Sequence, residues 1–499
     1  MGDTITIRGS GFGNTRNESF VTIAGTPPTS GAYLHWTDTE ISLRLPEFGE
    51  AGLVRIHRGR SRSNGALFTS QTGLPTPLLG AYDGTEIRIS SIEPASGPVG
   101  TLISIMGNNF GSSRDASRVY FTWNPGPGLA TEMIEAQDLD FGYEFWSERE
   151  IRVRVPDGAS SGNLELVGSR GSSRPAFFEV SGMGGTKTYG DKRSYAFSYL
   201  VDFRFLETSL PNDLYAWVPR PVTSSSQRGV QLLDSSVPPF IENYRGSSLF
   251  QFTDALPLSG WTIRVSYVAE VYSIETNILN QAPPRLNTAS PISAAYTLPS
   301  PLVPSDEDSI RALATQITRL ERFPQGRAQR IYEWLINNAG IQGEALSGGV
   351  LEALEEGLAD SYQGALLFCA LARAVDIPAI PVAGVLVDRN QNTFPHYWAE
   401  FWIDGFGWVP VDPALGAGSA PHDFLLREDH VQYYFGNLDN QRITFSRAER
   451  PLTQITPWGR TLGRERDFAL QSIWEEAAGG IESYSSLWSG VTITGMYIY

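Results

Sequence analysis

Alternating apolar and polar residues dominate the front of the chain, in short runs that glycine and asparagine interrupt. Such alternation predicts antiparallel strands with one buried face. The alternation resumes from Ser194 to about Ile278, and one face of its first strand carries Tyr195, Phe197, Tyr199, Val201 and Phe203. We therefore predict that the chain begins with a series of β domains.

The β-rich front contains an internal repeat. Gly2–Gly13 matches Gly100–Gly111 at an offset of 98, and Trp36–Pro46 matches Trp146–Pro156 at an offset of 110. The second copy therefore carries 12 extra residues, which fall around Asn124 to Tyr143. The pattern within each copy predicts a small antiparallel β-sandwich.

Both copies resemble IPT/TIG immunoglobulin-like domains. The resemblance is clearest in Ile92–Thr101 followed by Gly107–Gly111. The first copy begins at the position equivalent to Gly100 and lacks the counterpart of Ile87–Val99. We therefore expect the natural chain to extend upstream of residue 1, with an export signal there.

A helical pattern takes over behind the β-rich part. Ser305 and Asp308 have the spacing of a helix N-cap and the acid three positions later, and helices are predicted from there to about Phe323 and from Gly326 to Asn338. Ala365–Val375 is apolar nearly all round, which predicts a buried helix with Asp360 as its N-cap.

Two strands follow this helix and form a predicted hairpin. His396–Ile403 and Phe406–Asp412 flank Asp404-Gly405, a good tight-turn dipeptide. His396 and Asp412 each lie eight residues from Asp404. Folding about that turn sets them nearly opposite, with side chains about 5 Å apart on a shared face. A slip of one residue would separate them.

Four motifs now stand in order along the chain. They are Asp360-Ser361-Tyr362-Gln363-Gly364, Arg373-Ala374-Val375-Asp376-Ile377-Pro378-Ala379, His396-Tyr397-Trp398-Ala399-Glu400 and Gly407-Trp408-Val409-Pro410-Val411-Asp412-Pro413. The order resembles the transglutaminase-like superfamily, whose core has a papain-like α+β fold. The resemblance implies a catalytic triad of Ser361 in the nucleophile position, His396 as base and Asp412 as the group that orients it.

Ser361 departs from this family, in which the nucleophile is cysteine. Three explanations stay open: an engineered replacement, a natural pseudoenzyme, or a working Ser-His-Asp hydrolase. The backbone N–H of Ser361 is the candidate oxyanion donor, and Gln363 or Trp334 is a candidate for the second. Trp398 and Glu400 share the face of His396. Glu400 either supports the site or is a satisfied buried carboxylate. Trp398 either shields the site or lines a substrate groove, or it packs in the core.

Composition narrows the class of partner. The net charge of −16 argues against nucleic acid and anionic membranes as partners. The sequence contains no run of 18 apolar residues, so we predict no membrane span in it. The only cysteine, Cys369, lies eight positions after Ser361, about 12 Å along the helix, and is predicted to be a buried structural thiol. We predict no metal, because the sequence has no dense calcium-loop pattern, and we predict no cofactor.

These observations predict a multidomain chain: two all-β immunoglobulin-like sandwiches, an all-β domain that resembles the one often preceding bacterial transglutaminase-like cores, and an α+β core. The predicted boundaries are 1–70, 87–181, 190–285 and 301–430, then a strand-bearing extension over 431–499 that packs on the core, with linkers at 71–85, 181–192 and 281–304.

The resemblance implies acyl transfer to, or hydrolysis of, peptide or glutaminyl amides, with weak or absent activity because serine replaces cysteine. The alternative is a non-catalytic surface protein that keeps a peptide- or glycan-binding groove. We expect a bacterial, extracytoplasmic protein (periplasmic, cell-surface or secreted). A cell-wall polymer is a candidate partner of the two sandwiches.

Overall fold

The computed structural model describes residues 4–17, 19–23, 27–45, 52–59, 61–63, 65–68, 86–126, 128–182, 184–254, 256–257, 260–278, 290–464 and 466–499. The predicted linker at 71–85 lies outside these residues, as does most of the first half of the one at 281–304. Within the described part of the chain, no helix is long and apolar enough to cross a membrane.

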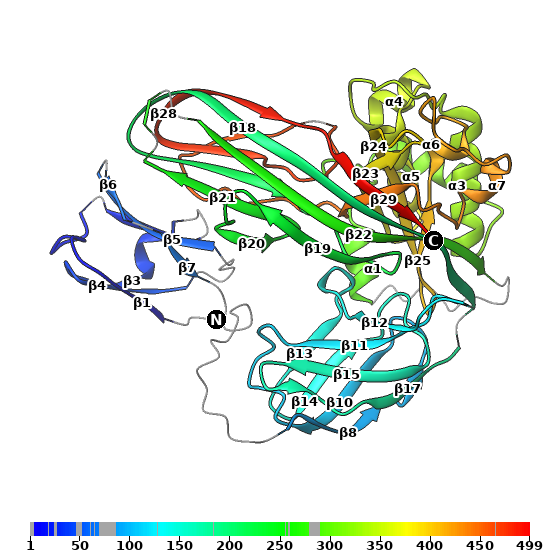
Figure 1. Cartoon of the computed structure of the whole chain (residues 1–499), viewed down its shortest axis with the longest axis horizontal. Coiled ribbons are helices and arrows are strands. Elements are labelled where there is room, and N and C mark those ends of the chain that lie inside the picture. Colours follow the sequence, from blue (N-terminus) through cyan, green and yellow to red (C-terminus); the bar gives the residue numbers. More distant parts are fainter. Residues whose placement is uncertain are drawn as a thin grey trace.

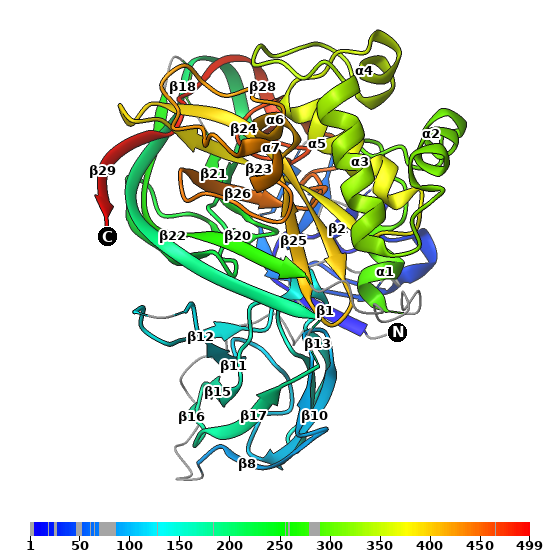
Figure 2. The same ribbon diagram turned by 90° about the vertical axis from the view of Figure 1, so that its right-hand side faces the viewer.

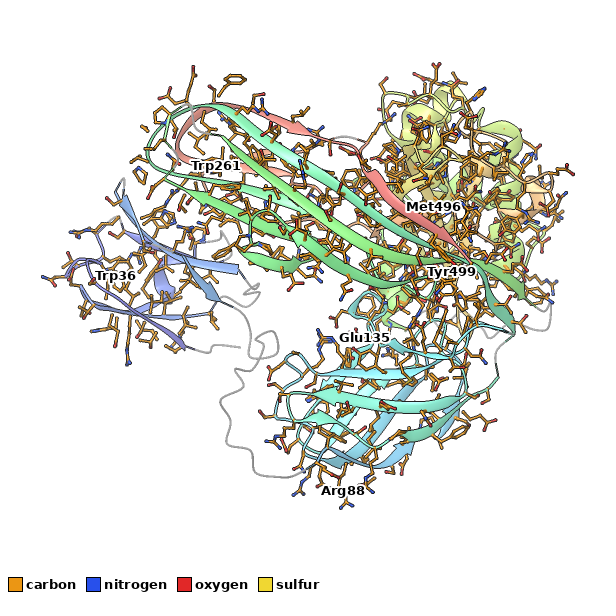
Figure 3. All side chains as sticks on the ribbon, in the orientation of Figure 1. Trp36, Arg88, Glu135, Trp261, Met496 and Tyr499 are labelled. Carbon is orange, nitrogen blue, oxygen red and sulfur yellow. The ribbon has the colours of Figure 1, made fainter. Side chains whose placement is uncertain are left out.

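The first repeat forms a small sandwich (Figure 1). One sheet has the order β1-β4-β3 and the other β2-β5-β6, with β7 beside β5. The strands are β1 Thr4–Arg8, β2 Phe20–Ile23, β3 Tyr33–Trp36, β4 Glu40–Arg44, β5 Gly52–Arg58, β6 Ser61–Arg62 and β7 Ala66–Phe68, with a 3-10 helix at Ser30–Ala32. Trp36 lies in this sandwich (Figure 3).

The second repeat forms a larger sandwich, with sheets β13-β14-β10-β8 and β12-β11-β15-β17-β9. Its elements are β8 Arg88–Glu93, β9 Ser96–Gly97, β10 Leu102–Asn108, β11 Arg118–Trp123, β12 Glu132–Glu135, a 3-10 helix at Asp138–Asp140, β13 Tyr143–Trp146, β14 Glu150–Arg154, β15 Gly162–Gly168, β16 Gly171–Ser172 and β17 Ala176–Val180. The segment predicted to be longer in this copy, 124–143, includes β12.

A sheet of long strands follows, in the order β19-β22-β18-β21-β20. The bounds are β18 Gly185–Pro219, β19 Gln227–Ser235, β20 Ile241–Tyr244, β21 Ser247–Thr253 and β22 Trp261–Ile278. The predicted linker at 181–192 is wrong over most of its length, because β18 already begins at Gly185 and pairs with Ile278 at the end of β22. Glycines suggested a break there, but the distant partner strand satisfies the backbone.

The C-terminal strands also belong mainly to this β domain. β27 Arg460–Leu462 pairs with β28 Glu475–Trp488, and β28 and β29 Thr492–Ile498 pair with β18. Only β26 Arg442–Arg447 enters the sheet of the core. The two sheets share one hydrophobic core, in which Val385 and Phe445 of the core domain pack with Tyr199 and Trp474.

The core domain has a sheet in the order β25-β24-β23-β26. Its strands are β23 Ala379–Val387, β24 Thr393–Ile403, β25 Gly407–Val411 and β26, and its helices are α1 Pro291–Tyr296, α2 Asp308–Thr318, α3 Pro324–Asn338, α4 Val350–Glu356, α5 Ser361–Arg373, α6 Pro413–Gly416 and α7 His430–Tyr433. Helices α3 and α5 pack on the sheet face that carries Ala399, Phe401 and Ile403 (Figure 2).

The two predicted N-caps have different outcomes. Asp360 caps α5 as predicted, and its side chain accepts from Gln363 N. The predicted cap Ser305 is wrong, because α2 begins at Asp308 with Glu307 in the cap position and Ser305 buried. A serine can close a turn ahead of a helix as well as cap it, and the two uses leave the same sequence pattern.

Both sandwiches dock on the rest of the chain. Arg62 of the first lies 2.9 Å from Asp213 on β18. The second is held more deeply, because Trp408 on β25 donates to the buried Asp140 at 2.8 Å, and the buried Asp157 pairs with Lys187 at the start of β18. The second sandwich therefore packs against the hairpin that carries His396 and Asp412, and it is not a separate spacer.

Candidate active site

The predicted hairpin exists, but its register differs from the prediction by two residues. Ala399 pairs with Val411, so continuing the register sets Asp412 across from Trp398 rather than from His396. An even shift leaves each side chain on its original face, because side chains alternate with a period of two. His396 and Asp412 are diagonal neighbours, and His396 Nε2 lies 2.8 Å from Asp412 Oδ2.

This contact defines how His396 can act. Because Nε2 faces a carboxylate, the proton of the neutral imidazole lies on Nε2, and the lone pair lies on Nδ1. No described residue makes a hydrogen bond with Nδ1. His396 is 5% exposed, and its ring stacks near Trp398, with ring centroids 6.1 Å apart. The pair thus presents a basic nitrogen from a largely buried, oriented ring.

Asp412 is held from several sides. Its Oδ1 accepts from Leu415 N at 3.0 Å, where it caps α6, and its Oδ2 accepts from both His396 and Arg442. Burial by itself raises the pKa of Asp412, but the charge and hydrogen bond of His396 and the Arg442 guanidinium outweigh it, so the pKa is lowered. Asp412 therefore stays an anion that orients His396.

Arg442 is the part of this site that the sequence prediction missed. Its Nη1 lies 3.0 Å from Asp412 Oδ2, and its Nη2 lies 2.7 Å from Asp439 Oδ2. The guanidinium also lies 4.9 Å from the centre of the Trp398 ring. The only signal in the sequence was a charged residue at the start of an apolar strand, and nothing local linked it to Asp412.

The start of α5 is fixed by a network around its N-cap. Asp360 Oδ2 accepts from Leu346 N at 2.9 Å and from Arg466 Nη1 at 2.7 Å. The Arg466 guanidinium also lies 5.1 Å from the centre of the Tyr362 ring. A segment near the C-terminus thereby covers the helix start that carries Ser361.

Ser361 is half-buried at the first position of α5. The next residue, Tyr362, packs edge-on against Tyr397 beside His396, with ring centroids 4.9 Å apart. A side chain at Gly364 would come within 3.9 Å of Pro413, next to Asp412. The structure brings the three segments together, but Ser361 Oγ makes no hydrogen bond with His396 or any other described residue.

The two candidates for a second oxyanion donor are engaged otherwise. The carboxamide of Gln363 donates to the carbonyl oxygens of Ser347 at 3.0 Å and Gly348 at 3.2 Å, and accepts from Asp360 N. Both of its protons therefore hold the loop ahead of the helix. Trp334 lies partly buried in the apolar layer between the helices and the sheet. A second donor is not identified among the described residues.

The two candidates on the His396 face also have defined partners. Glu400 Oε2 lies 2.6 Å from Arg447 Nη2 and 3.0 Å from Arg447 Nε, so it is a partly buried carboxylate with its own counter-charge. Trp398 is buried between His396 and Arg442, where it packs against both. Trp398 supports the ring of His396, whereas Glu400 is tied to a different ion pair.

Cys369 lies in the middle of α5 and is fully buried. Burial raises the pKa of its thiol to about 12. A thiol in this environment stays protonated and out of reach of substrates.

Comparison with known families agrees with this architecture. Residues 311–413 match the transglutaminase-like superfamily, and residues 1–70 and 88–180 match the IPT/TIG domain. The chain carries a transglutaminase-like core behind two IPT/TIG domains. The predicted families and the mostly β, multidomain fold class are confirmed. A Haemophilus influenzae protein named only as uncharacterized is 26% identical over 200 residues, which cover 34% of this chain and 54% of the relative. The chain thus spans about half the length of that relative.

The solved structures that match this chain do so only weakly. A candidate cysteine protease from Cytophaga hutchinsonii is 14% identical, with a TM-score of 0.40, and the match covers 63% of this chain and 93% of that one. The periplasmic domain of TgpA from Pseudomonas aeruginosa has a TM-score of 0.25 at 14% identity, over 47% and 94% of the two chains. The surface glycan-binding protein PbSGBP-B from Prevotella bryantii has a TM-score of 0.17 at 9% identity, over 56% and 94%. Likeness at this level defines neither an activity nor a ligand.

Proposed function

We propose that this transglutaminase-like protein acts on peptide or glutaminyl amides by acyl transfer or hydrolysis, with Ser361 in the nucleophile position and weak or absent activity. The observation that carries the proposal is the buried His396–Asp412 pair at 2.8 Å. Its orientation leaves Nδ1 as the base, and the start of α5 with Ser361 lies against the same two segments.

The chemistry uses only residues of this chain. Ser361 Oγ attacks the amide carbon as its proton passes to His396 Nδ1, and the C–O bond forms. The backbone N–H groups at the start of α5 are candidates to stabilise the oxyanion. His396 then returns the proton to the amide nitrogen as the C–N bond breaks, which leaves an ester on Ser361. Water or a second amine releases the acyl group by the same proton transfers.

Serine is expected to slow this sequence. A cysteine at this position would be present partly as a thiolate, stabilised by a histidine cation and by the positive end of the helix. A hydroxyl gains little from that field before attack and needs proton removal in the same step. We therefore expect the Ser361 hydroxyl, rather than the His396–Asp412 pair, to limit the rate of acyl transfer.

The test is a Ser361→Cys variant, assayed with a glutamine-rich protein for ammonia release and for incorporation of a biotinylated amine. We expect a gain of at least about a hundredfold over the chain with Ser361, which is the lower end of what one positioned catalytic group contributes. The double variant Ser361→Cys/His396→Ala is the matched control and must lose the gain. Buried Cys369 does not interfere with thiol labelling of the variant. A labelled but inactive Ser361→Cys protein would reject the catalytic proposal.

A binding function without catalysis is the second candidate. The observation that favours it is the missing hydrogen bond between Ser361 Oγ and His396. Hydrogen bonds of catalytic groups often tighten only with substrate, so both candidates stand at this point. A pull-down of the full chain on cell-wall polymers tests the glycan form of this function, and absence of binding at high protein concentration removes it. Location outside the cytoplasm is part of the proposal, and cell fractionation of the natural protein tests it.

A further inference from the structure

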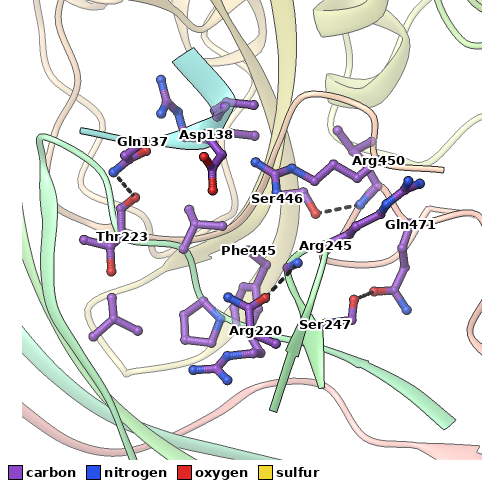
Figure 4. Close-up of a pocket in the computed structure, with 18 of the residues that line it drawn as sticks. Gln137, Asp138, Arg220, Thr223, Arg245, Ser247, Phe445, Ser446, Arg450 and Gln471 are labelled. Atoms are coloured by element: carbon purple, nitrogen blue, oxygen red, sulfur yellow. Dashed lines mark hydrogen bonds between the residues drawn. The ribbon is translucent and has the colours of Figure 1, made fainter. Parts of the chain in front are cut away.

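A cavity lies where the second sandwich, the β domain and the core domain meet (Figure 4). Its volume is about 340 Å³. Glu135, at the end of β12, lies on the side of the second sandwich that faces the β domain (Figure 3). Five arginines from the three domains line the cavity, together with Glu135 and Asp138: Arg118, Arg220, Arg245, Arg447 and Arg450. Positive charge thus gathers in one place of a chain with a net charge of −16.

Four of the five arginines have partners in the protein. Arg118 Nε lies 2.7 Å from Glu135 Oε1, and Arg447 Nη2 lies 2.6 Å from Glu400 Oε2. The two arginines of the β domain donate to backbone carbonyl oxygens. The guanidinium of Arg450, in contrast, makes no hydrogen bond or ion pair with any described residue.

Arg450 extends into the cavity in the direction of Asp138 (Figure 4). Asp138 is already neutralised, because Arg114 Nη2 donates to it at 2.9 Å and Arg114 Nη1 donates to its other oxygen. Burial lowers the pKa of Arg450, and the neighbouring Arg447 adds to this effect. Asp138 and Asp140 act on this guanidinium only through their fields, without a hydrogen bond or ion pair. A cation that is partly withdrawn from water and has no carboxylate within hydrogen-bond distance is a favourable partner for an added anion.

We propose that this cavity binds a small oxyanion, a carboxylate or phosphate group, with Arg450 as its main contact. A guanidinium matches both groups because it can donate two parallel hydrogen bonds to their oxygens. The volume is in the range of pockets that hold small molecules. Since the lining comes from three domains, a bound anion would also hold the second sandwich to the core.

Thermal unfolding of the full chain tests the proposal, with inorganic phosphate and glucuronate as probes and glucose as the neutral control for glucuronate. Sodium chloride keeps the ionic strength constant. A ligand that binds only the folded protein raises its Tm in a saturable way, and we expect at least about 2 °C from one of the two anions. A shift with phosphate but not with glucuronate would identify the bound group as a phosphate. A shift with glucuronate but not with glucose would identify it as a carboxylate.

The variant Arg450→Gln must lose this shift, and Arg319→Gln, an exposed arginine at the end of α2, must keep it. If Arg450→Gln does not fold, Arg450→Lys replaces it. Lysine keeps the charge but loses the paired donors, so its affinity for the same anion should fall at least about fivefold. The proposal is overturned if neither anion gives a saturable shift, or if the Arg450 variant responds like the natural sequence.

Discussion

Replacing Arg442 with methionine is the sharpest test of the electrostatics around His396 and Asp412. Methionine has a similar length but no charge, so Arg442→Met removes one cation and little volume. Arg442 bridges Asp412 and Asp439 at 3.0 and 2.7 Å, and its side chain is 3% exposed. The substitution therefore leaves two carboxylates, one of them fully buried, without their shared counter-charge.

The expected loss of stability in Arg442→Met depends on the hydrogen bonds that Asp412 keeps. Removing one partner of a buried ion pair costs about 3–5 kcal/mol, because the remaining charge is left uncompensated. Asp412 still accepts from His396 and from the backbone N–H of Leu415. We therefore expect the lower end of the range, about 3 kcal/mol near pH 7.

The cost should depend on pH in a defined direction. The pKa of Asp412 is lowered in the folded protein, with Arg442 among the causes. Such a carboxylate contributes stability above its unfolded pKa of about 3.9, and that stability is lost as the pH falls through the folded pKa. Removing Arg442 reduces this contribution. The difference between the natural chain and Arg442→Met should thus shrink as the pH falls below about 4.

Urea unfolding followed by tryptophan fluorescence at about pH 7 and about pH 2.5, well below the unfolded pKa of Asp412, measures the difference. Arg319→Met, at an exposed position of the same domain, is the control and should change stability by less than about 0.5 kcal/mol. A cost below about 1 kcal/mol at neutral pH would mean that the bridge behaves like a surface pair. A cost that does not fall in acid would also refute the reasoning, because Asp412 would then not be the group that senses Arg442.

Three further outcomes are expected. Burial raises the pKa of Asp140 to about 6, so this group's contribution to stability is complete below about pH 3.9 and is lost as the pH rises through 6. Asp140→Asn should therefore raise the free energy of unfolding near pH 7 by up to about 3 kcal/mol. It should also flatten the dependence of the Tm on pH between about 3.9 and 6. A variant that is less stable than the parent chain near pH 7 would contradict this prediction. Cys369, with a pKa of about 12 from burial, should resist a thiol reagent at about pH 8 until urea unfolds the chain; labelling of the native protein would contradict its burial. Asp412→Ala should abolish the exchange-protected NMR signal of the His396 Nε2 proton without unfolding the chain, and a persisting signal would argue against their hydrogen bond.

Local pattern accounts for the parts of this protein that were predicted correctly. Alternation identified the two sandwiches, the long strand through Tyr195 and the hairpin, because a half-buried strand imposes a period of two on its own residues. The N-cap Asp360 was recognisable because capping joins groups only three residues apart. Even the register error in the hairpin left His396 and Asp412 together, since a shift of two preserves the face.

Tertiary structure alone decided the rest. Arg442 meets Asp412 across 30 positions of chain, and Trp408 meets Asp140 across 268, so neither contact leaves a local mark in the sequence. The strand that begins at Gly185 was mistaken for a linker because its partner lies near residue 278. A periodic pattern reports which face of an element is buried. Only the packed fold determines which distant charge or strand is buried against it.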